Sequence, residues 1–280
     1  MPKKFKTLMD RHAVTAAIIA FAVIEVLLLG LGRLLSLLPD TLAMDYLREI
    51  VLIIVPIAIV CFFGFAPAFK KGNFMRGMRC FLPYTLFLLF ALGAFFANNL
   101  GEPEVTWSPW YMILYGVFSI IGVGIREECV YRATIQHIVA RKHANSPKGI
   151  WLTVWVGSII FGLSHAANLL FGVEPMPVLR QVISATFIGL LFGAVYLRSG
   201  NLWAAALIHT LTDIVGLSKS TFLGIGMTNE LNEMTLSLGT VLSWVVYLGF
   251  TAYLLRPAKC KEIYENLGFA ENAPEADAHQ

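Results

Sequence analysis

Three short groups of residues, each with ionisable side chains, lie inside long apolar stretches of this sequence. They are Glu127, Glu128 and Arg132; Phe161 and His165; and His209 and Asp213. An ionisable side chain costs roughly 2.5–3.5 kcal/mol to insert into a bilayer, and such residues are kept where they pair, face a cavity or do chemistry. We therefore treat the three groups as candidates for one shared functional site.

Spacing within the first group gives its two carboxylates different roles. Arg132 follows Glu128 by four residues, so on a helix the two side chains share a face and can pair. Glu127 is rotated by about 100° from Glu128 and has less access to that partner. A carboxylate without a counter-ion in a low-dielectric site suits a general base. The structural alternative is a solvated charge cluster on a cytosolic extension of the helix.

The second and third groups supply imidazoles. His165 follows Phe161 by four residues with Asn168 near the same face, and His209 precedes Asp213 by four. An aspartate one helical turn from a histidine can orient its ring. Each group alone could be structural, as a buried histidine bonded between helices or as a polar clamp. Because all three groups lie within the same apolar layer, a shared polar site is favoured over three separate structural ones.

One carboxylate and two imidazoles are sufficient for hydrolysis. The carboxylate takes a proton from water, and an imidazole or amide stabilises the oxyanion. The same three side chains, Glu127, His165 and His209, could alternatively hold a divalent metal such as zinc with one position open for water. The residues alone leave both possibilities open.

The composition indicates what kind of protein must position these groups. Of 280 residues, 57% are hydrophobic and 14% charged, and the mean hydropathy is +0.70. A soluble domain carries about 25% charged residues, so a soluble enzyme and a disordered chain are both excluded. The apolar runs are continuous, which predicts an all-α polytopic membrane bundle and not a β-barrel. A net charge of +3 is too small to indicate a nucleic-acid partner.

Eight apolar blocks are each long enough, or nearly so, to cross a bilayer. They are Ala13–Leu38, Ile50–Phe69, Cys80–Ala97, Trp110–Ile125 with a helical continuation to about Ala140, Ile150–Phe171, Gln181–Leu197, Leu202–Leu217 and Met234–Leu255. We expect about eight transmembrane helices in a single membrane domain, residues 1–280. Its catalytic core is expected at about 80–220, and residues 256–280 are expected to form a cytosolic tail.

Basic residues predict the orientation of this bundle. With eight spans and a cytosolic N-terminus, only Arg33, Arg48, Arg180 and Lys219 fall on the outer side. Lys and Arg gather on the cytoplasmic side of membrane proteins. We therefore expect an integral, multi-pass protein of the cell (plasma) membrane with both termini cytoplasmic. Membrane lipid is one expected partner.

The three motifs together resemble those of the CPBP intramembrane proteases, also called the Abi or CAAX-protease family. The pattern is Glu127-Glu128-x-x-x-Arg132, Phe161-x-x-x-His165 and His209-x-x-x-Asp213. This family includes the type II CAAX prenyl endopeptidases. The motif order, their location on separate helices and the eight-span layout are similar, over about residues 80–220.

The resemblance implies an endopeptidase whose site is buried in the membrane and open to the cytosol. It implies that Glu127 activates the attacking water and that His165, His209 and Asp213 are catalytic, with Glu128, Arg132, Phe161 and Asn168 supporting them. The prenyl-protein enzymes commonly have Asn where this chain has Asp213. We expect no required metal, because Glu128 is committed to Arg132; zinc on Glu127, His165 and His209 is the alternative.

The expected substrate is a membrane-associated or lipidated protein or peptide. Two other functions fit parts of the sequence. A non-catalytic immunity or scaffold protein could retain the same fold. A proton-coupled transporter could also use membrane carboxylates and histidines. The sequence shows no internal repeat, and its ionisable groups cluster in the second half. Both features favour the protease.

Overall fold

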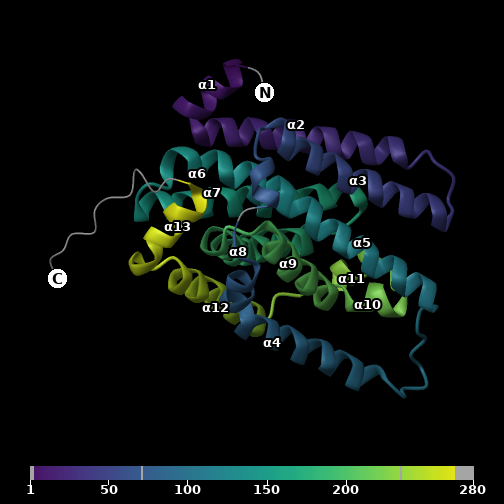
Figure 1. Ribbon diagram of the computed structural model, residues 1–280. Helices are drawn as coiled ribbons and strands as arrows, with labels where there is room; N and C mark the ends of the chain where they lie inside the picture. Colours follow the sequence, from purple (N-terminus) through teal and green to yellow (C-terminus); the bar gives the residue numbers. More distant parts are fainter. Residues whose placement is uncertain (1–2, 71, 234, 269–280) are drawn as a thin grey trace.

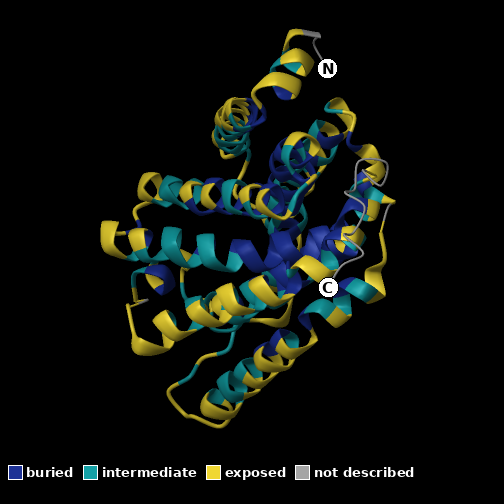
Figure 2. Cartoon of the chain, turned by 90° about the vertical axis from the view of Figure 1, so that its left-hand side faces the viewer, coloured by how far each residue is buried: buried dark blue, intermediate teal, exposed yellow. Residues whose placement is uncertain are grey.

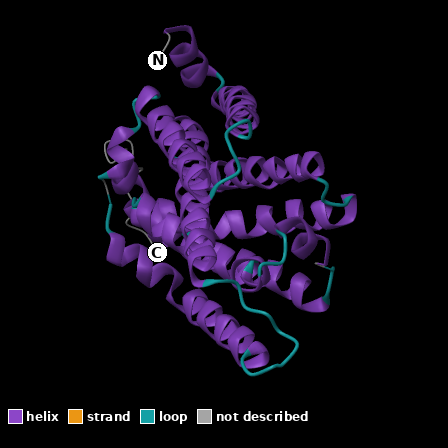
Figure 3. Cartoon of the chain, turned by 90° about the vertical axis from the view of Figure 1, so that its right-hand side faces the viewer, coloured by secondary structure: helices purple, strands orange, loops and turns teal. Residues whose placement is uncertain are grey.

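The described part of the chain is helical and has no β-strand, as the sequence predicts (Figures 1 and 3). The structure, a computed structural model, describes residues 3–70, 72–233 and 235–268. Residues 269–280 of the predicted cytosolic tail lie outside the described residues. The elements are α1 (Lys3–Arg11), α2 (Ala13–Leu35), α3 (Leu42–Phe62), η1 (Ala66–Phe69), α4 (Phe74–Asn99), α5 (Trp110–Glu128), η2 (Cys129–Gln136), α6 (His137–His143), α7 (Pro147–Ser164), η3 (His165–Phe171), α8 (Pro175–Ser199), α9 (Leu202–Gly216), α10 (Ser218–Leu223), α11 (Met227–Glu233), α12 (Leu238–Leu254), η4 (Pro257–Lys259) and α13 (Cys260–Leu267).

Four helices are long and apolar enough on their own to cross a membrane. They are α2, α4, α8 and the α7–η3 stretch Pro147–Phe171. The number rises to five if α11 and α12 form one bent span. Helices α3, α5 and α9, which cover the remaining blocks, are not among these candidates; α9 has 15 residues, and α3 carries Asp45, Arg48 and Glu49. The chain is thus an all-helical membrane protein, and the count of eight spans stays a prediction.

Helix α8 lies at the centre of the bundle and packs against α4, α7, α9 and α12. Every residue from Gly189 to Ser199 is buried, and Figure 2 shows buried segments gathered in the middle of the bundle. Peripheral helices instead expose large apolar side chains, among them Val26, Phe90 and Leu238. An apolar exterior around a packed interior is the expected surface of a bundle in lipid.

Local sequence signals fix the turn between α8 and α9. Gly200 adopts φ +62°, a left-handed conformation that favours glycine and ends α8. Asn201 then caps α9, because its side-chain oxygen accepts a hydrogen bond of 3.0 Å from the backbone N–H of Ala204. This tight turn sends α9 back along α8 and carries His209 into the bundle.

Two predicted helices change their winding beside the candidate residues. The fourth block forms α5 up to Glu128, then the π-helical segment η2, and then α6. The fifth block is α-helical up to Ser164 and continues from His165 as the 3-10 segment η3. Single π-helical turns occur often at functional sites. The sequence pattern predicts the helices but not these changes, because side-chain periodicity differs little between helix types.

Both described ends of the chain lie at one end of the bundle (Figure 1). Near the N-terminus, the Lys142 side chain donates a hydrogen bond to the Arg11 carbonyl. Near the C-terminus, Arg198 forms an ion pair of 2.8 Å with Glu262. Most of the basic residues assigned to the cytosolic side by sequence gather here, so the predicted charge asymmetry corresponds to one physical end of the molecule.

Candidate active site

Helices α5 and α9 approach closely enough to join the first and third motifs. At Gly124, an added Cβ would lie 2.4 Å from Thr210 Oγ1 and 3.1 Å from the Ala206 carbonyl oxygen. Small residues allow membrane helices to pack this closely. Because Gly124 is one turn before Glu128 and Thr210 follows His209, the close approach brings the glutamate pair against the imidazole.

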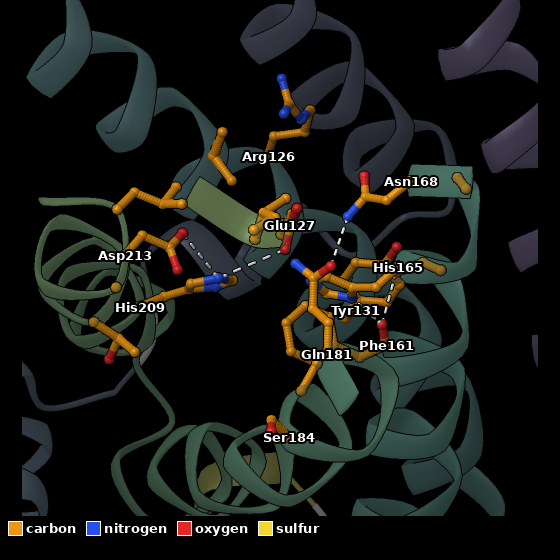
Figure 4. A pocket seen from close by; sticks show the side chains of 18 of the residues that line it. Arg126, Glu127, Tyr131, Phe161, His165, Asn168, Gln181, Ser184, His209 and Asp213 are labelled. Carbon is orange, nitrogen blue, oxygen red and sulfur yellow. Dashed lines mark hydrogen bonds and ion pairs between the residues drawn. The ribbon is translucent and has the colours of Figure 1, made fainter. Parts of the chain in front are cut away.

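Three carboxylates surround the His209 ring. Its Nδ1 lies 3.0 Å from Glu128 Oε1, and its Nε2 lies 3.5 Å from Glu127 Oε2 and 3.4 Å from Asp213 Oδ2. Figure 4 shows the contacts to Glu127 and Asp213. The sequence predicts Asp213 as the residue that orients the ring. The shortest contact instead comes from Glu128, because α5 approaches the ring from the other side.

Glu128 is held in place by a buried ion pair. Its Oε2 lies 3.1 Å from Arg132 Nε, and both side chains are 0% exposed. The Arg132 guanidinium also lies over the faces of Phe161 and Phe192, 4.9 Å and 5.8 Å from the ring centroids. The pairing predicted from the four-residue spacing is therefore present. Through it, Glu128 connects Arg132 to His209.

Glu127 differs from its neighbour in that it faces a cavity. Its side chain is 22% exposed, against 0% for Glu128. The cavity has a volume of about 700 Å³ and is lined by the predicted residues Glu127, Phe161, His165, Asn168, His209 and Asp213 (Figure 4). The adjacent carboxylates thus point into different environments, one into the cavity and one into the packed interior.

His165 reaches the cavity as the first residue of η3. Its Nδ1 donates a hydrogen bond of 2.9 Å to the Phe161 carbonyl oxygen, because that oxygen can only accept. The buried Phe161 ring packs edge-on against both imidazoles, with centroids 5.0 Å from His165 and 5.5 Å from His209. Phe161 therefore sets the orientation of both rings.

Two further polar pairs line the cavity and add Tyr131, Glu25 and Gln181 to the site. Tyr131 donates a hydrogen bond of 2.7 Å to Glu25 Oε1 on α2. Asn168 donates one of 2.8 Å to Gln181 Oε1 on α8. Glu25 could have been found from the sequence, because it is a glutamate within the first apolar block. Gln181 gave no such signal, because it lies at the edge of its block, where polar residues are common.

The geometry of a metal site is not present at Glu127, His165 and His209. Among the described residues, no group of three or more His, Cys, Asp or Glu side chains is arranged to hold a metal ion. The His209 Nδ1 atom is already engaged by Glu128. We therefore derive no step through a metal.

The cavity extends away from the end of the bundle that holds the termini. Its lining comes from the second half of α2, the end of the α7–η3 stretch and the last turns of α9, which lead to the connections at 36–41, 172–174 and 217–226. Cavity and termini therefore lie toward opposite ends of the bundle. The sequence predicts cytosolic termini, and the resemblance implies a site open to the cytosol.

The fold and the site together define a membrane protein with a polar, carboxylate- and imidazole-lined cavity enclosed by its helices. Residues 108–215 match the family model described as "Type II CAAX prenyl endopeptidase Rce1-like". That segment runs from the start of α5 to the end of α9 and contains all three motifs. The match supports the resemblance seen in these motifs and points to a protease. No curated protein and no solved structure matches the chain significantly.

Proposed function

We propose that this protein is an intramembrane endopeptidase that hydrolyses a peptide bond of a membrane-associated or lipidated protein or peptide. The observation that supports this most directly is the difference between two adjacent carboxylates. Glu127 faces the cavity beside His209, while Glu128 is buried against Arg132. A general base must be accessible to water and held in one position, and Glu127 meets both requirements.

In the proposed reaction, Glu127 accepts a proton from a water molecule bound between it and the substrate. The water oxygen attacks the carbonyl carbon of the peptide bond, and the carbonyl oxygen becomes an oxyanion. His165 and His209 hold the water and the oxyanion by hydrogen bonds. The C–N bond then breaks, and the proton taken up by Glu127 passes to the leaving amine. The active site is restored without a covalent intermediate.

The supporting residues act by positioning these groups. Glu128 and Asp213 hold the two nitrogens of His209, and Arg132 neutralises Glu128 in the interior. Phe161 packs between the imidazoles. Asn168 and Gln181 form a hydrogen-bonded pair on the cavity wall, where amide groups can bind a substrate backbone. No metal is required in this proposal, and zinc is the alternative that a chelator tests.

The proposed setting is the plasma membrane, crossed about eight times, with both termini in the cytosol. This orientation follows the basic residues, which are the direct physical determinant of topology. The cavity extends toward the other end of the bundle, so the labelling experiment below also tests the cytosolic opening that the resemblance implies.

Cleavage by purified protein in liposomes tests the activity. Alkylated fluorogenic peptides are incubated with wild type, Glu127→Gln and Glu104→Gln, with and without a chelator. Glu104 is an exposed loop glutamate and serves as the control. We expect Glu127→Gln to lose about 10²–10⁴-fold in rate while remaining folded, and Glu104→Gln to keep full activity. Cleavage by Glu127→Gln at the wild-type rate would contradict the mechanism.

The same preparation separates the other two functions. A proton-coupled transporter gives pH-dependent solute flux without peptide cleavage, and a scaffold gives neither. Loss of cleavage with chelator, restored by zinc, would favour the metal alternative.

Orientation is tested by labelling single cysteines on intact cells with a membrane-impermeant maleimide, in a Cys61→Ser background because Cys61 is exposed. We expect Ser36→Cys, near the cavity, to react and Lys261→Cys, near the C-terminus, to remain unlabelled until the cells are opened. The reverse pattern would assign the cavity to the cytosol and the termini to the outside.

A further inference from the structure

A second cavity lies at the end of the bundle that holds the termini and has a volume of about 260 Å³. Its walls are η1 with the turn before it, α6, the end of α8 and the end of α13. Figure 1 shows α6 and α13 close to the two ends of the chain. The described residues that line it are all different from those that line the active-site cavity. The two cavities are therefore separate sites.

The lining of the second cavity is basic. Arg141 carries a permanent positive charge, and His137, four residues earlier on α6, shares its face and can donate a hydrogen bond. Among the described residues that line the cavity, none is Asp or Glu. Arg141 is exposed and belongs to none of the ion pairs between described residues. The cavity therefore presents a positive charge that no lining carboxylate cancels.

The C-terminus of α8 reaches this cavity but does not need the charge. The last four carbonyls of a helix lack partners within it and are often compensated by cations. In α8 the carbonyls of residues 196–199 all accept hydrogen bonds from the protein. The first accepts from Gly200 N–H at 2.7 Å, the next two from the Asn266 side-chain amide at 3.0 and 2.7 Å, and the fourth from Asn73 N–H at 2.8 Å. The charge of Arg141 is therefore available to a ligand.

Packing holds the imidazole at the cavity wall. The His137 ring lies against the buried Phe65 ring, with the two centroids 4.6 Å apart. Just before Phe65, Gly64 adopts φ +78°, a left-handed conformation that favours glycine and lets the chain turn from α3 into η1. A donor that is already fixed in position loses little conformational entropy when a ligand binds. His137 is thus preorganised, while the exposed Arg141 side chain can adjust.

Trp203 indicates that this cavity lies at the level of lipid headgroups. Its indole Nε1 donates a hydrogen bond of 3.0 Å to the Phe69 carbonyl oxygen in η1, and the residue is 39% exposed. Tryptophan is enriched at this level in membrane proteins, and basic pockets between helices there bind anionic headgroups. A cavity of about 260 Å³ is smaller than the roughly 300–1,000 Å³ that holds a drug-sized ligand. It therefore suits a headgroup and not a whole lipid.

We propose that the second cavity binds a phosphate group through the Arg141 guanidinium and the His137 imidazole. A guanidinium can donate two parallel hydrogen bonds to phosphate oxygens. The phosphate is that of an anionic phospholipid headgroup, as the position of Trp203 favours, or a free phosphate. This inference is independent of the proposed protease function. Its consequence is stability, because a ligand that binds only the folded protein raises the melting temperature.

Thermal unfolding of the full-length protein in maltoside micelles tests the site. Dioleoylphosphatidylglycerol, dioleoylglycerol or sodium phosphate is titrated into phosphate-free buffer at about 0.15 M salt, where charges more than roughly 8 Å apart are screened. The proteins are wild type, Arg141→Gln, His137→Gln and the double variant. Arg11→Gln is the matched control, because Arg11 is an exposed arginine in the last turn of α1, at the same end of the bundle and outside the cavity lining.

We expect dioleoylphosphatidylglycerol to raise the melting temperature of wild type more than dioleoylglycerol, which has the same acyl chains and no phosphate. The midpoint of its titration should rise about tenfold or more in Arg141→Gln, the scale of losing a charged hydrogen bond. It should rise in His137→Gln as well and stay within about twofold of wild type in Arg11→Gln. If sodium phosphate gives the same stabilisation, and Arg141→Gln loses it, free phosphate is the ligand; if only the phospholipid does, the headgroup is.

Two results would overturn the proposal. One is equal stabilisation by the two lipids together with none by sodium phosphate. The other is an unchanged titration midpoint in the double variant, as expected if anionic lipid is attracted to the basic end of the bundle as a whole. Because Arg141 is exposed, Arg141→Gln should melt like wild type without ligand, so a changed midpoint reports binding and not folding. No peptide is cleaved in this experiment, so its outcome is separate from that of the protease assay.

Discussion

Among the described residues, two arginines lie over phenylalanine rings, and their surroundings are opposite. Arg132 lies in the packed interior, is 0% exposed, and is ion-paired with Glu128; its guanidinium carbon lies 4.9 Å from the Phe161 centroid. Arg33 lies in the last turn of α2 and is exposed, and its guanidinium carbon lies 5.4 Å from the Phe171 centroid. The same kind of cation–π contact therefore occurs both inside a packed core and at an exposed position.

The difference shows how position determines what a charge can do. A buried arginine must have its charge compensated by the protein itself, so Arg132 is coupled to the stability of the fold. The exposed Arg33 does not need such compensation. We expect substitution of Arg132 to damage folding and catalysis together, and substitution of Arg33 to leave the fold intact.

The largest effect is expected for Arg132→Met. It leaves the buried Glu128 carboxylate uncompensated, which costs about 3–5 kcal/mol in unfolding free energy. Cleavage should also be lost, because Glu128 holds His209. Reversible unfolding in mixed detergent micelles measures the change. Arg33→Met is the matched control and should shift the unfolding free energy by less than about 0.5 kcal/mol. Equal shifts for the two variants would invalidate the comparison.

A smaller effect is expected where α5 meets α9. Gly124→Ala directs a Cβ to within 2.4 Å of Thr210 Oγ1, so the helices must separate, at a cost of about 1–3 kcal/mol. Peptide cleavage should fall because Glu127 moves away from His209.

Gly116→Ala on the same helix is the control for this effect, since its nearest contact is an ordinary 3.5 Å to Thr221. Alanine is favoured over glycine in a helix by roughly 1 kcal/mol, so this variant should be neutral or slightly more stable. Thermal unfolding of both variants in detergent measures the difference in stability between them. If Gly124→Ala were as stable and active as Gly116→Ala, the close approach would not position the site.

A weaker effect is expected on the cavity wall. Tyr131→Phe removes the hydrogen bond to Glu25 and should cost about 1 kcal/mol in unfolding free energy. Glu25 faces the cavity, so water can replace the hydroxyl, and the peptide cleavage rate should fall only severalfold. The exposed Tyr111→Phe should change neither quantity. A loss of cleavage as large as that of Glu127→Gln would assign Tyr131 a direct role in the reaction.

The smallest effect concerns the end of the bundle that holds the termini. Partial burial opposes ionisation of Glu262, but the Lys259 hydrogen bond and the Arg198 charge outweigh it and lower the pKa of this carboxyl below its usual value. A lowered pKa stabilises the fold above the unfolded-state value, and this stabilisation is lost as the pH falls through the folded-state value. Because Glu262 is only partly buried, water screens the pair and its contribution stays at about 1 kcal/mol or less.

Glu262→Gln should therefore lower the melting temperature slightly at pH 7 and have no effect near pH 3, where the wild-type carboxyl is protonated. Glu265→Gln on the same helix is the control. A destabilisation by Glu262→Gln that persists undiminished at pH 3 would rule out the charge as its cause.

The helices could be predicted from sequence because hydrophobic length and composition are local properties. The eight apolar blocks are largely helical where the structure describes them, although α3, α5, α9 and α12 are not candidate spans by themselves. The number of crossings could not be settled in this way, because a short or charged helix crosses only with the help of its neighbours. The π-helical segment after Glu128 could not be predicted from the side-chain periodicity either.

The candidate site was predictable to the extent that its contacts are local. The Glu128–Arg132 pair and the His209–Asp213 contact each join residues four apart, so helical geometry alone brings them together. The contact between His209 and Glu128 joins residues 81 positions apart. It depends on how closely α5 and α9 pack, which no spacing in the sequence encodes.

By itself, the sequence determined a helical membrane protein, its motif residues and the gathering of basic residues on one side, because these follow from composition and from backbone geometry over one or two turns. Only the tertiary structure decided which carboxylate faces the cavity, which atom holds each nitrogen of His209, and toward which end the cavity extends. The physical reason is that a cavity is bounded by side chains from several helices, and their relative positions result from packing the whole bundle.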